Sequence, residues 1–351
     1  MLKNIRRATL QGLQRAGFSR WFAEGQWRRH RLLILCYHGI SRNDEHLWRP
    51  GLYMQPNVLR ERLDILKRGG YNVLPLGEGL RQMQAGELPP RSVAITFDDG
   101  TYDFYEQAYP LLKNHGFPVT VYQTTYYSDY QKPLFNLVCS YLLWQRRGTV
   151  LDKGRELGLD QPMDLRTEVS RHQILRRLVR SITDGLSGAE KNDVAARLAN
   201  LLGIDYDELV AKRVLHLMNS QEVAQLAAEG VDFQLHTHRH RTPADEALFR
   251  KEIQDNRRRL QEVAKSTATH FCFPSGVYQT QFLPWLKAEN VVSATTCDAG
   301  LASPRSNLLL LPRFVDTAAR TAIEFESWLT GVGSLLAFRR MASQSYKPPE
   351  E

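Results

Sequence analysis

Short apolar runs alternate with segments of helical spacing along most of this 351-residue chain. Such repeated strand-then-helix order predicts a mostly parallel sheet with helices outside it. About seven strands with acids and histidines at their carboxyl ends indicate a barrel whose chemistry gathers at that end. The predicted strands cover residues 32–37, 71–74, 93–97, 119–122, 231–235, 269–273, 291–295 and 308–311.

Residues 132–215 interrupt this alternation. Three segments there, 134–144, 174–182 and 195–202, have helical spacing with charged faces, and no convincing strand lies between them. A helix then opens at Asn219 with Glu222 three positions on, a capping-box pattern. The sequence predicts an α/β protein divided into a basic N-terminal arm (1–31), a barrel (32–131 and 216–338), a helical insertion (132–215) and a flexible tail (339–351).

Positive charge is concentrated in the N-terminal arm. The formal net charge is +8, and the segment before residue 32 alone carries eight basic residues against one acid. Apolar and aromatic side chains alternate with these charges, so the arm could rest at an anionic membrane surface. It could equally pack on the barrel with its arginine side chains in water. Because no nucleic-acid-binding motif accompanies the charge, we do not expect a nucleic-acid partner.

The remaining composition bears on the compartment. No run approaches the ~20 apolar residues of a membrane-spanning helix, and the N-terminus lacks the pattern of a secretory signal. We therefore expect the protein in the cytoplasm, with the arm as a possible contact to the inner face of the membrane. Four scattered cysteines are expected to be reduced core residues: Cys36, Cys139, Cys272 and Cys297.

Two adjacent carboxylates, Asp98 and Asp99, follow the apolar run 93–97 where the backbone must turn at Gly100. Like charges at one place are costly without a cation between them, so this pair suggests a metal ion. A second strand-like run, 231–235, leads into His236 and His240. An aspartate with paired histidines is a typical zinc ligand set.

The order of these motifs resembles the polysaccharide deacetylase family, also called the NodB-homology family or carbohydrate esterase family 4. Residues 96–100, Thr-Phe-Asp-Asp-Gly, match its first motif, and residues 236–240, His-Thr-His-Arg-His, match its second, H-[ST]-x-x-H. Residues 271–276, Phe-Cys-Phe-Pro-Ser-Gly, resemble its third, R-x-P-x-G. The resemblance covers roughly residues 32–125 and 215–315, and it implies a distorted (β/α)7-type barrel.

The resemblance also implies metal-dependent removal of an N-acetyl, less often O-acetyl, group from a sugar. By this likeness, Asp99, His236 and His240 would bind a divalent ion, and Asp98 would be the general base. The backbone N–H of Ser275 would stabilise the oxyanion. Zinc is the favoured ion, but cobalt, nickel and manganese also suit this ligand set.

Two features depart from the family pattern. Cys272 stands where the third motif has an arginine that orients the base aspartate, and Arg313, at the end of another strand-like run, is a candidate replacement. No late Leu-x-x-His supplies the proton that an amine leaving group needs. His38, after the first strand, is the candidate donor; the alternative is a histidine that only shapes the mouth of the barrel.

Three functions remain open on these grounds. The first is deacetylation of an N-acetylhexosamine in a glycan or lipid-linked glycan precursor, for a bacterial envelope or exopolysaccharide. The second is an O-acetyl esterase or small-amide deacetylase. The third is a glycan-binding module with a decayed site, suggested by the altered third motif.

Overall fold

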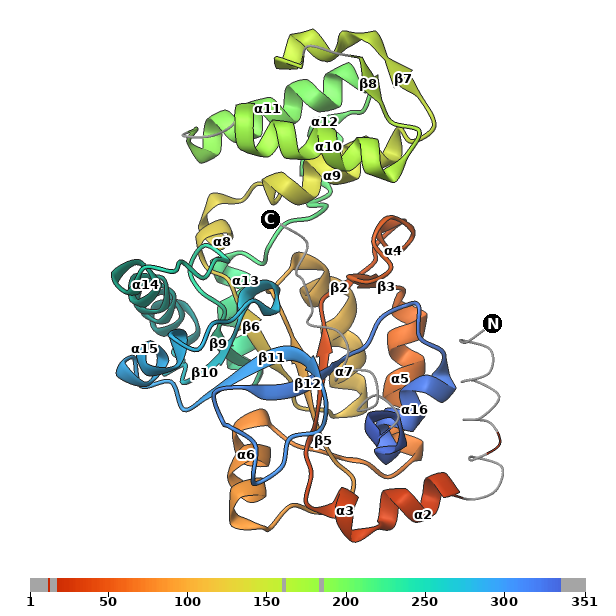
Figure 1. Ribbon diagram of the computed structural model, residues 1–351, viewed down its shortest axis with the longest axis vertical. Coiled ribbons are helices and arrows are strands. Elements are labelled where there is room, and N and C mark those ends of the chain that lie inside the picture. The colour runs from red at the N-terminus through yellow and green to blue at the C-terminus, as the bar shows by residue number, and fades with distance from the viewer. Residues whose placement is uncertain (1–11, 13–17, 160–161, 183–185, 336–351) are drawn as a thin grey trace.

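Seven parallel strands close into a barrel in the computed structural model, which describes residue 12 and residues 18–159, 162–182 and 186–335 (Figure 1). Strand β1 pairs with both β12 and β5, and this double pairing closes the ring. An eighth short strand, β4 (Asn72–Val73), extends the sheet beside β5. The predicted α/β barrel of (β/α)7 type is confirmed. Around the ring the strands are β1 (Leu33–Tyr37), β12 (Leu311–Val315), β11 (Ser293–Ala299), β10 (His270–Cys272), β9 (Asp232–Leu235), β6 (Thr120–Gln123) and β5 (Ser92–Phe97).

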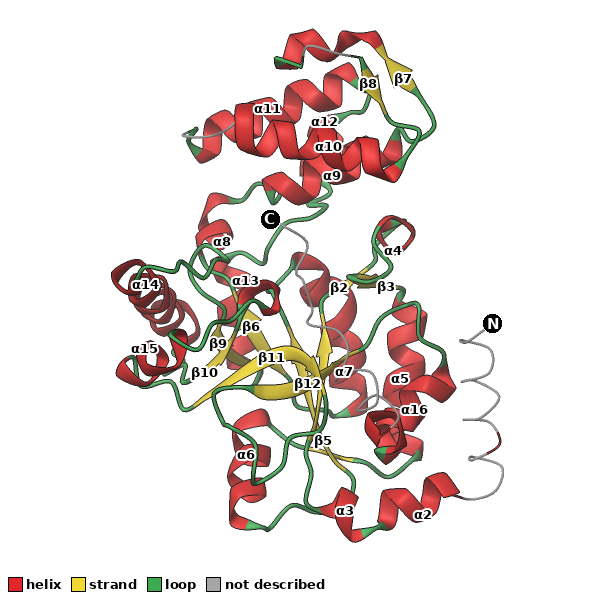
Figure 2. Cartoon of the chain, in the orientation of Figure 1, coloured by secondary structure: helices red, strands yellow, loops and turns green. Residues whose placement is uncertain are grey.

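Helices surround the barrel because each connection between parallel strands must cross back over the sheet (Figure 2). Helix α13 begins with the predicted capping box, in which the side chains of Asn219 and Glu222 each bond the other's backbone N–H. Strands β1 and β5 are buried along their whole length, so the core lies inside and around the ring. The outer helices are α5 (Pro56–Arg68), α6 (Leu76–Ala85), α7 (Tyr109–His115), α13 (Ser220–Ala228), α14 (Glu246–Ala264), α15 (Phe282–Ala288) and α16 (Ala322–Thr330).

Several short elements lie at the carboxyl end of the barrel. Strands β2 (Gly39–Ile40) and β3 (Tyr53–Met54) pair in parallel, with helix α4 (Glu45–Trp48) between them in the chain. A π-helical segment, Phe104–Ala108, runs into α7, and helix α8 (Tyr126–Tyr130) follows β6. Helices α4 and α8 lie between the barrel and the helices of residues 135–211 (Figure 1).

The segment after α8 folds around a hydrophobic cluster separate from that of the barrel, with Val138, Leu142 and Leu198 among its buried members. The expectation that no strand lies here is wrong, because β7 (Val150–Leu151) and β8 (Met163–Asp164) form an antiparallel pair. Strands of two residues are too short to leave an alternating pattern in the sequence. The helices are α9 (Phe135–Gln145), α10 (Glu168–Arg177), α11 (Gly188–Leu201) and α12 (Tyr206–Ala211), with a 3-10 turn over Asp152–Leu157 and a π-helical segment over Leu178–Ile182.

The end of the N-terminal arm packs on the barrel through helices α2 (Phe18–Glu24) and α3 (Gln26–Arg29). Arg28 is fully buried and donates to the carbonyls of Leu329 and Ser92, both at 2.9 Å. The interpretation that all arginines of the arm lie in water is therefore wrong for Arg28. Residues 1–11 and 13–17 of the arm, and the predicted flexible tail 339–351, fall outside the described residues. No described helix is long and apolar enough to cross a membrane.

Candidate metal and catalytic site

The three predicted metal ligands meet at the carboxyl end of the barrel. Asp99 follows β5, whereas His236 and His240 follow β9. Asp99 Oδ1 lies 3.1 Å from His236 Nε2 and 3.2 Å from His240 Nε2. Burial alone would raise the pKa of Asp99, but its hydrogen bonds with the two imidazoles hold that pKa well below the usual range. Together the three atoms form a group able to hold one metal ion.

The tautomer of His236 fits a metal ligand. Its Nδ1 lies 2.9 Å from the carbonyl oxygen of Cys272, which can only accept, so Nδ1 carries the proton. In the neutral ring, Nε2 then points a lone pair at the Asp99 carboxylate. Two acceptors 3.1 Å apart repel each other unless a cation or a proton lies between them. A backbone carbonyl on the far nitrogen is also the usual support of a metal-binding histidine.

Helix α14 holds in place the loop of residues 236–241, which we call the histidine loop. This support was not predicted from the sequence. Asn256 Oδ1 accepts from the backbone N–H of His236 at 3.0 Å, and Asn256 Nδ2 donates to the carbonyl of Gln123. Glu252, 1% exposed, accepts from the backbone N–H of Arg239 at 2.8 Å. Glu252 and Asn256 lie four apart among the apolar core positions of α14. Polar residues on a core-facing stripe were the signal that could have identified them.

Asp98 lies in a buried ion pair with Arg313. The guanidinium donates to both carboxylate oxygens, at 2.7 and 2.8 Å, and the side chains of Asp98 and Arg313 are 3% and 0% exposed. Burial would raise the pKa of Asp98, but Arg313 holds it well below its usual range. In the family pattern, the arginine that contacts the aspartate stands at the position of Cys272. Here Arg313 makes a contact of this kind with Asp98, and the Cys272 thiol lies 3.1 Å from the same guanidinium.

Two sequence expectations about this region need correction. Arg313 was expected at the end of the strand-like run 308–311, but strand β12 covers Leu311–Val315, so Arg313 lies in its middle. Cys36 and Cys272 are buried as expected, with sulfurs 3.5 and 3.4 Å from Asp98 Oδ2, but Cys297 is exposed. Its sulfur lies 3.9 Å from Arg313 Nη2, so Cys297 borders the candidate site while remaining open to solvent, which its residue type does not reveal.

His38 and Ser275 lie at the same end of the barrel, after β1 and β10 respectively. His38 Nε2 lies 3.6 Å from Asp98 Oδ2, which places the imidazole beside the carboxylate. Ser275 is exposed and has a left-handed backbone, with φ of 56°. Its backbone belongs to the 3-10 turn Pro274–Gly276, within the third motif.

Left-handed backbone occurs in each of the three motifs. Asp99, Thr237, His240 and Ser275 all have positive φ, between 55° and 70°. Such conformations cost about 1–3 kcal/mol each for residues with a side chain and tend to occur where function requires them. Gly100, with φ of 76°, has no room for a Cβ, which would lie 1.9 Å from Gln123 Oε1. The glycine of the first motif is therefore required by both conformation and space.

Comparison with known proteins points to the same family as the sequence motifs. A family model described as polysaccharide deacetylase matches residues 85–159 and 203–292. A 97-residue stretch, 27% of this chain, is 27% identical to poly-beta-1,6-N-acetyl-D-glucosamine N-deacetylase of Escherichia coli (strain K12), of which it covers 14%. Over 93 residues, 26% of the chain, it is 32% identical to the putative polysaccharide deacetylase YxkH of Bacillus subtilis (strain 168), covering 31% of that protein. The chain thus spans less than a third of either relative.

The same fold occurs in a solved structure, the Streptococcus pyogenes deacetylase PplD in complex with acetate. The two match with a TM-score of 0.56 at 20% identity, over 86% of this chain and 97% of the other. At this identity the likeness concerns the fold alone. With the motifs, the closed barrel and the family match taken together, the chain belongs to the polysaccharide deacetylase family.

Proposed function

We propose that this protein is a metal-dependent deacetylase that hydrolyses the N-acetyl group of an N-acetylhexosamine in a glycan or lipid-linked glycan precursor. The observation that carries the proposal is the convergence of one carboxylate and two imidazole nitrogens beside a second, ionised carboxylate. Asp99, His236 and His240 would hold the ion, and zinc, cobalt, nickel and manganese all suit this set. A divalent ion held there supplies Lewis acidity, which acidifies water and polarises a carbonyl.

Asp98 is the proposed general base. Its ion pair with Arg313 keeps it ionised. Oδ2 also lies beside the thiols of Cys36 and Cys272, whereas Oδ1 accepts only from Arg313 among the described side chains and retains an acceptor position that can take a proton from water. We assign Arg313 as the residue that positions Asp98. Without this grip, a buried carboxylate could turn away from the substrate or take up a proton from solvent.

His38 is the proposed proton donor to the amine leaving group. Its Nε2 lies 3.6 Å from Asp98 Oδ2, so the ring stands beside the proposed base, where it could deliver a proton to the amine as the tetrahedral intermediate collapses. The backbone N–H of Ser275 is the proposed donor to the oxyanion. A pH–rate profile of His38→Ala tests the acid role: loss of the alkaline limb is expected, and a retained alkaline limb would refute it.

The proposed function is tested by metal analysis and acetate release. We expect about one divalent ion per chain and release of acetate from N-acetylglucosamine oligomers, both lost on chelation. His240→Ala should lose metal and activity together, whereas His172→Ala, an exposed histidine of α10, should retain both. A protein without bound metal and without turnover on monosaccharide, nucleotide-linked and polyprenyl-linked substrates would contradict the proposal.

The same assays separate the alternatives. Faster release from acetyl esters or small amides than from N-acetylhexosamines would favour an esterase or small-amide deacetylase. Sugar binding without turnover, with affinity unchanged by Asp98→Asn, would favour a decayed binding module. The buried Arg313–Asp98 pair supports the enzymatic reading, because a decayed site has no need to keep a costly buried charge ionised.

The setting of the reaction is part of the proposal. The name of the E. coli relative supports a polysaccharide substrate, in envelope or exopolysaccharide biosynthesis. We propose that the enzyme acts in the cytoplasm, and that residues 1–31 contact the inner face of the membrane through their charge. Flotation with vesicles containing anionic lipid, compared with neutral vesicles, tests this contact; equal recovery with both would exclude it.

We also propose that residues 132–215 are an insertion into the barrel. The hydrophobic cluster of this segment, which is separate from that of the barrel, supports this division.

A further inference from the structure

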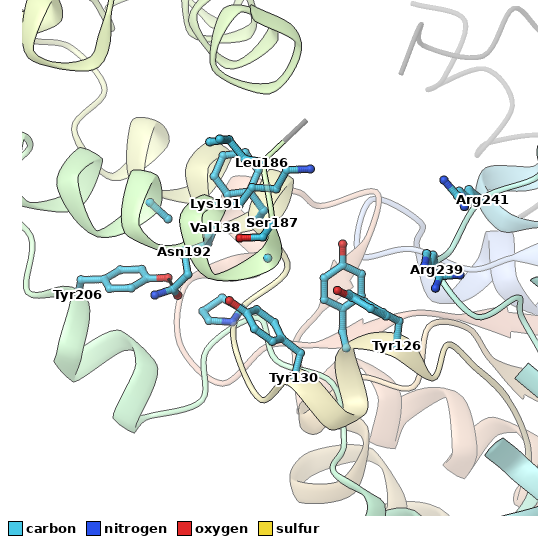
Figure 3. A pocket seen from close by; sticks show the side chains of 15 residues that line it. Tyr126, Tyr130, Val138, Leu186, Ser187, Lys191, Asn192, Tyr206, Arg239 and Arg241 are labelled. Carbon is cyan, nitrogen blue, oxygen red and sulfur yellow. Dashed lines mark hydrogen bonds between the residues drawn. The ribbon is translucent and has the colours of Figure 1, made fainter. Parts of the chain in front are cut away.

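A cavity of about 320 Å³ lies where the helical insertion meets the carboxyl end of the barrel (Figure 3). Tyr126 and Tyr130 of α8 and the arginines of the histidine loop line it on the barrel side. Lys191 and Tyr206 line it on the insertion side. This volume is at the lower end of the range of about 300–1,000 Å³ that is usual for small-molecule sites.

The walls combine aromatic rings with fixed polar groups. The Tyr130 ring packs against the first turn of α11, where a Cβ added at Gly188 would lie 3.2 Å from its Cζ. The hydroxyl of Tyr206 donates to Asn192 Oδ1 at 2.8 Å, which fixes both side chains at the cavity wall. Tyrosine rings offer flat apolar faces together with hydroxyl groups. Such walls suit a sugar ring, which has apolar C–H faces and polar edges.

The lining is positively charged. It includes Lys191, Arg239 and Arg241 and no carboxylate. Both arginines pair with Glu252, whose Oε1 lies 3.2 Å from Arg239 Nη1 and 2.7 Å from Arg241 Nε. These three side chains together therefore carry one net positive charge. Lys191 makes no ion pair with any residue of the described ranges and adds a second positive charge. Asp193, which is not part of the lining, is near enough to act on Tyr130 and Tyr206 and offsets part of this charge. A negatively charged ligand would therefore gain electrostatic energy here.

One loop contributes residues both to the cavity and to the candidate metal site. Arg239 and Arg241 flank His240, and consecutive Cα atoms are only about 3.8 Å apart. Tyr126 is fixed to the same loop, because its backbone N–H donates to the His238 carbonyl at 2.8 Å. A chain of sugars with one unit at the metal could thus place another in the cavity.

We propose that this cavity is a subsite for a sugar unit that carries a negative charge, either a carboxylate or a phosphate ester, on the same glycan as the acetylated sugar. The proposal rests on the proposed function and narrows its substrate to acidic glycans. Lys191 supplies the charge selectivity from the insertion, and the tyrosines hold the ring.

Binding without turnover tests the subsite separately from the deacetylase activity. The full-length protein is titrated, in EDTA, with a tetrasaccharide of alternating N-acetylglucosamine and glucuronate, with the uncharged N-acetylglucosamine tetramer, and with N-acetylglucosamine 1-phosphate. We expect one of the charged probes to bind at least tenfold more tightly than the neutral tetramer. Whether uronate or phosphate gives this preference identifies the source of the charge.

Lys191→Gln should reduce the affinity for the preferred charged probe about tenfold, and Lys191→Glu should abolish the preference. The control is Arg197→Gln, which removes an exposed charge of helix α11 outside the cavity lining. It should change neither the affinity for the charged probe nor that for the neutral tetramer. Equal affinity for charged and neutral probes, or a preference that survives Lys191→Glu in a protein with wild-type thermal unfolding, would overturn the subsite. Absent acetate release from all substrates would overturn the proposed function instead.

Discussion

Removal of Arg313 tests the energetics on which the site depends. Its two N···O distances to Asp98 are 2.7 and 2.8 Å, and the pair is almost wholly buried. In Arg313→Met, the carboxylate would keep only the weakly donating thiols of Cys36 and Cys272 and the neighbouring His38. Breaking a buried pair by removing one partner costs about 3–5 kcal/mol, and we expect the free energy of unfolding at pH 7 to fall by this amount.

The loss should grow with pH. In the wild type, burial would raise the pKa of Asp98 but Arg313 holds it far below the ordinary value. The pair therefore stabilises the fold above about pH 4, and this contribution is lost as the pH falls through the lowered folded-state pKa. In Arg313→Met, burial is opposed only by the smaller effects of His38 and His236, so the pKa of Asp98 rises and the variant loses stability as the pH increases. The difference between the two proteins should thus be small in acid and largest at neutral pH.

Urea unfolding at several pH values measures both effects, and a double-mutant cycle with Asp98→Asn isolates the pair. We expect a coupling energy of about 2–3 kcal/mol. Lys113→Met is the matched control, because Lys113 meets Glu229 at the same 2.7 Å but is 61% exposed, and its loss should cost under about 1 kcal/mol. Acetate release should fall sharply in Arg313→Met while metal content is unchanged. A stability loss as small as that of the control, or normal turnover, would refute the argument.

Three other substitutions test neighbouring features. Gly100→Ala should destabilise by about 2–5 kcal/mol in urea unfolding, because a left-handed alanine costs about 1–2 kcal/mol and the overlap with Gln123 about 1–3 more; a neutral effect would contradict the close approach. Burial raises the pKa of Asp103 to about 7, so the free energy of unfolding should fall by up to about 4 kcal/mol as the pH rises from about 4 to about 7. Urea unfolding of Asp103→Asn should show no such fall when it is compared with the wild type. An unchanged slope would show that Asp103 titrates normally. Asn256→Leu should weaken metal binding about 10–100-fold in competition with a chelator, since His236 loses its backbone acceptor; unaltered affinity would show that the loop holds itself.

The local features of this chain were predictable from the sequence because they depend on neighbouring residues. Alternating apolar runs and helical spacing predicted the barrel, and the Asn219–Glu222 capping box begins α13 as expected. The motif order also predicted that Asp99 and His236 would approach each other, since both follow parallel strands whose carboxyl ends lie at one rim.

Other features were decided by tertiary packing. Closure of the ring through β1 brings Arg313 onto Asp98 across 215 positions, and no local pattern marks that pairing. The partners of Arg28 and of Asn256, the carbonyl of Leu329 and the backbone N–H of His236, depend on which surfaces meet, not on residue type. The physical reason is that hydrophobic periodicity reports only whether a side chain faces the core. Which distant partner it finds there is set by how all elements pack together.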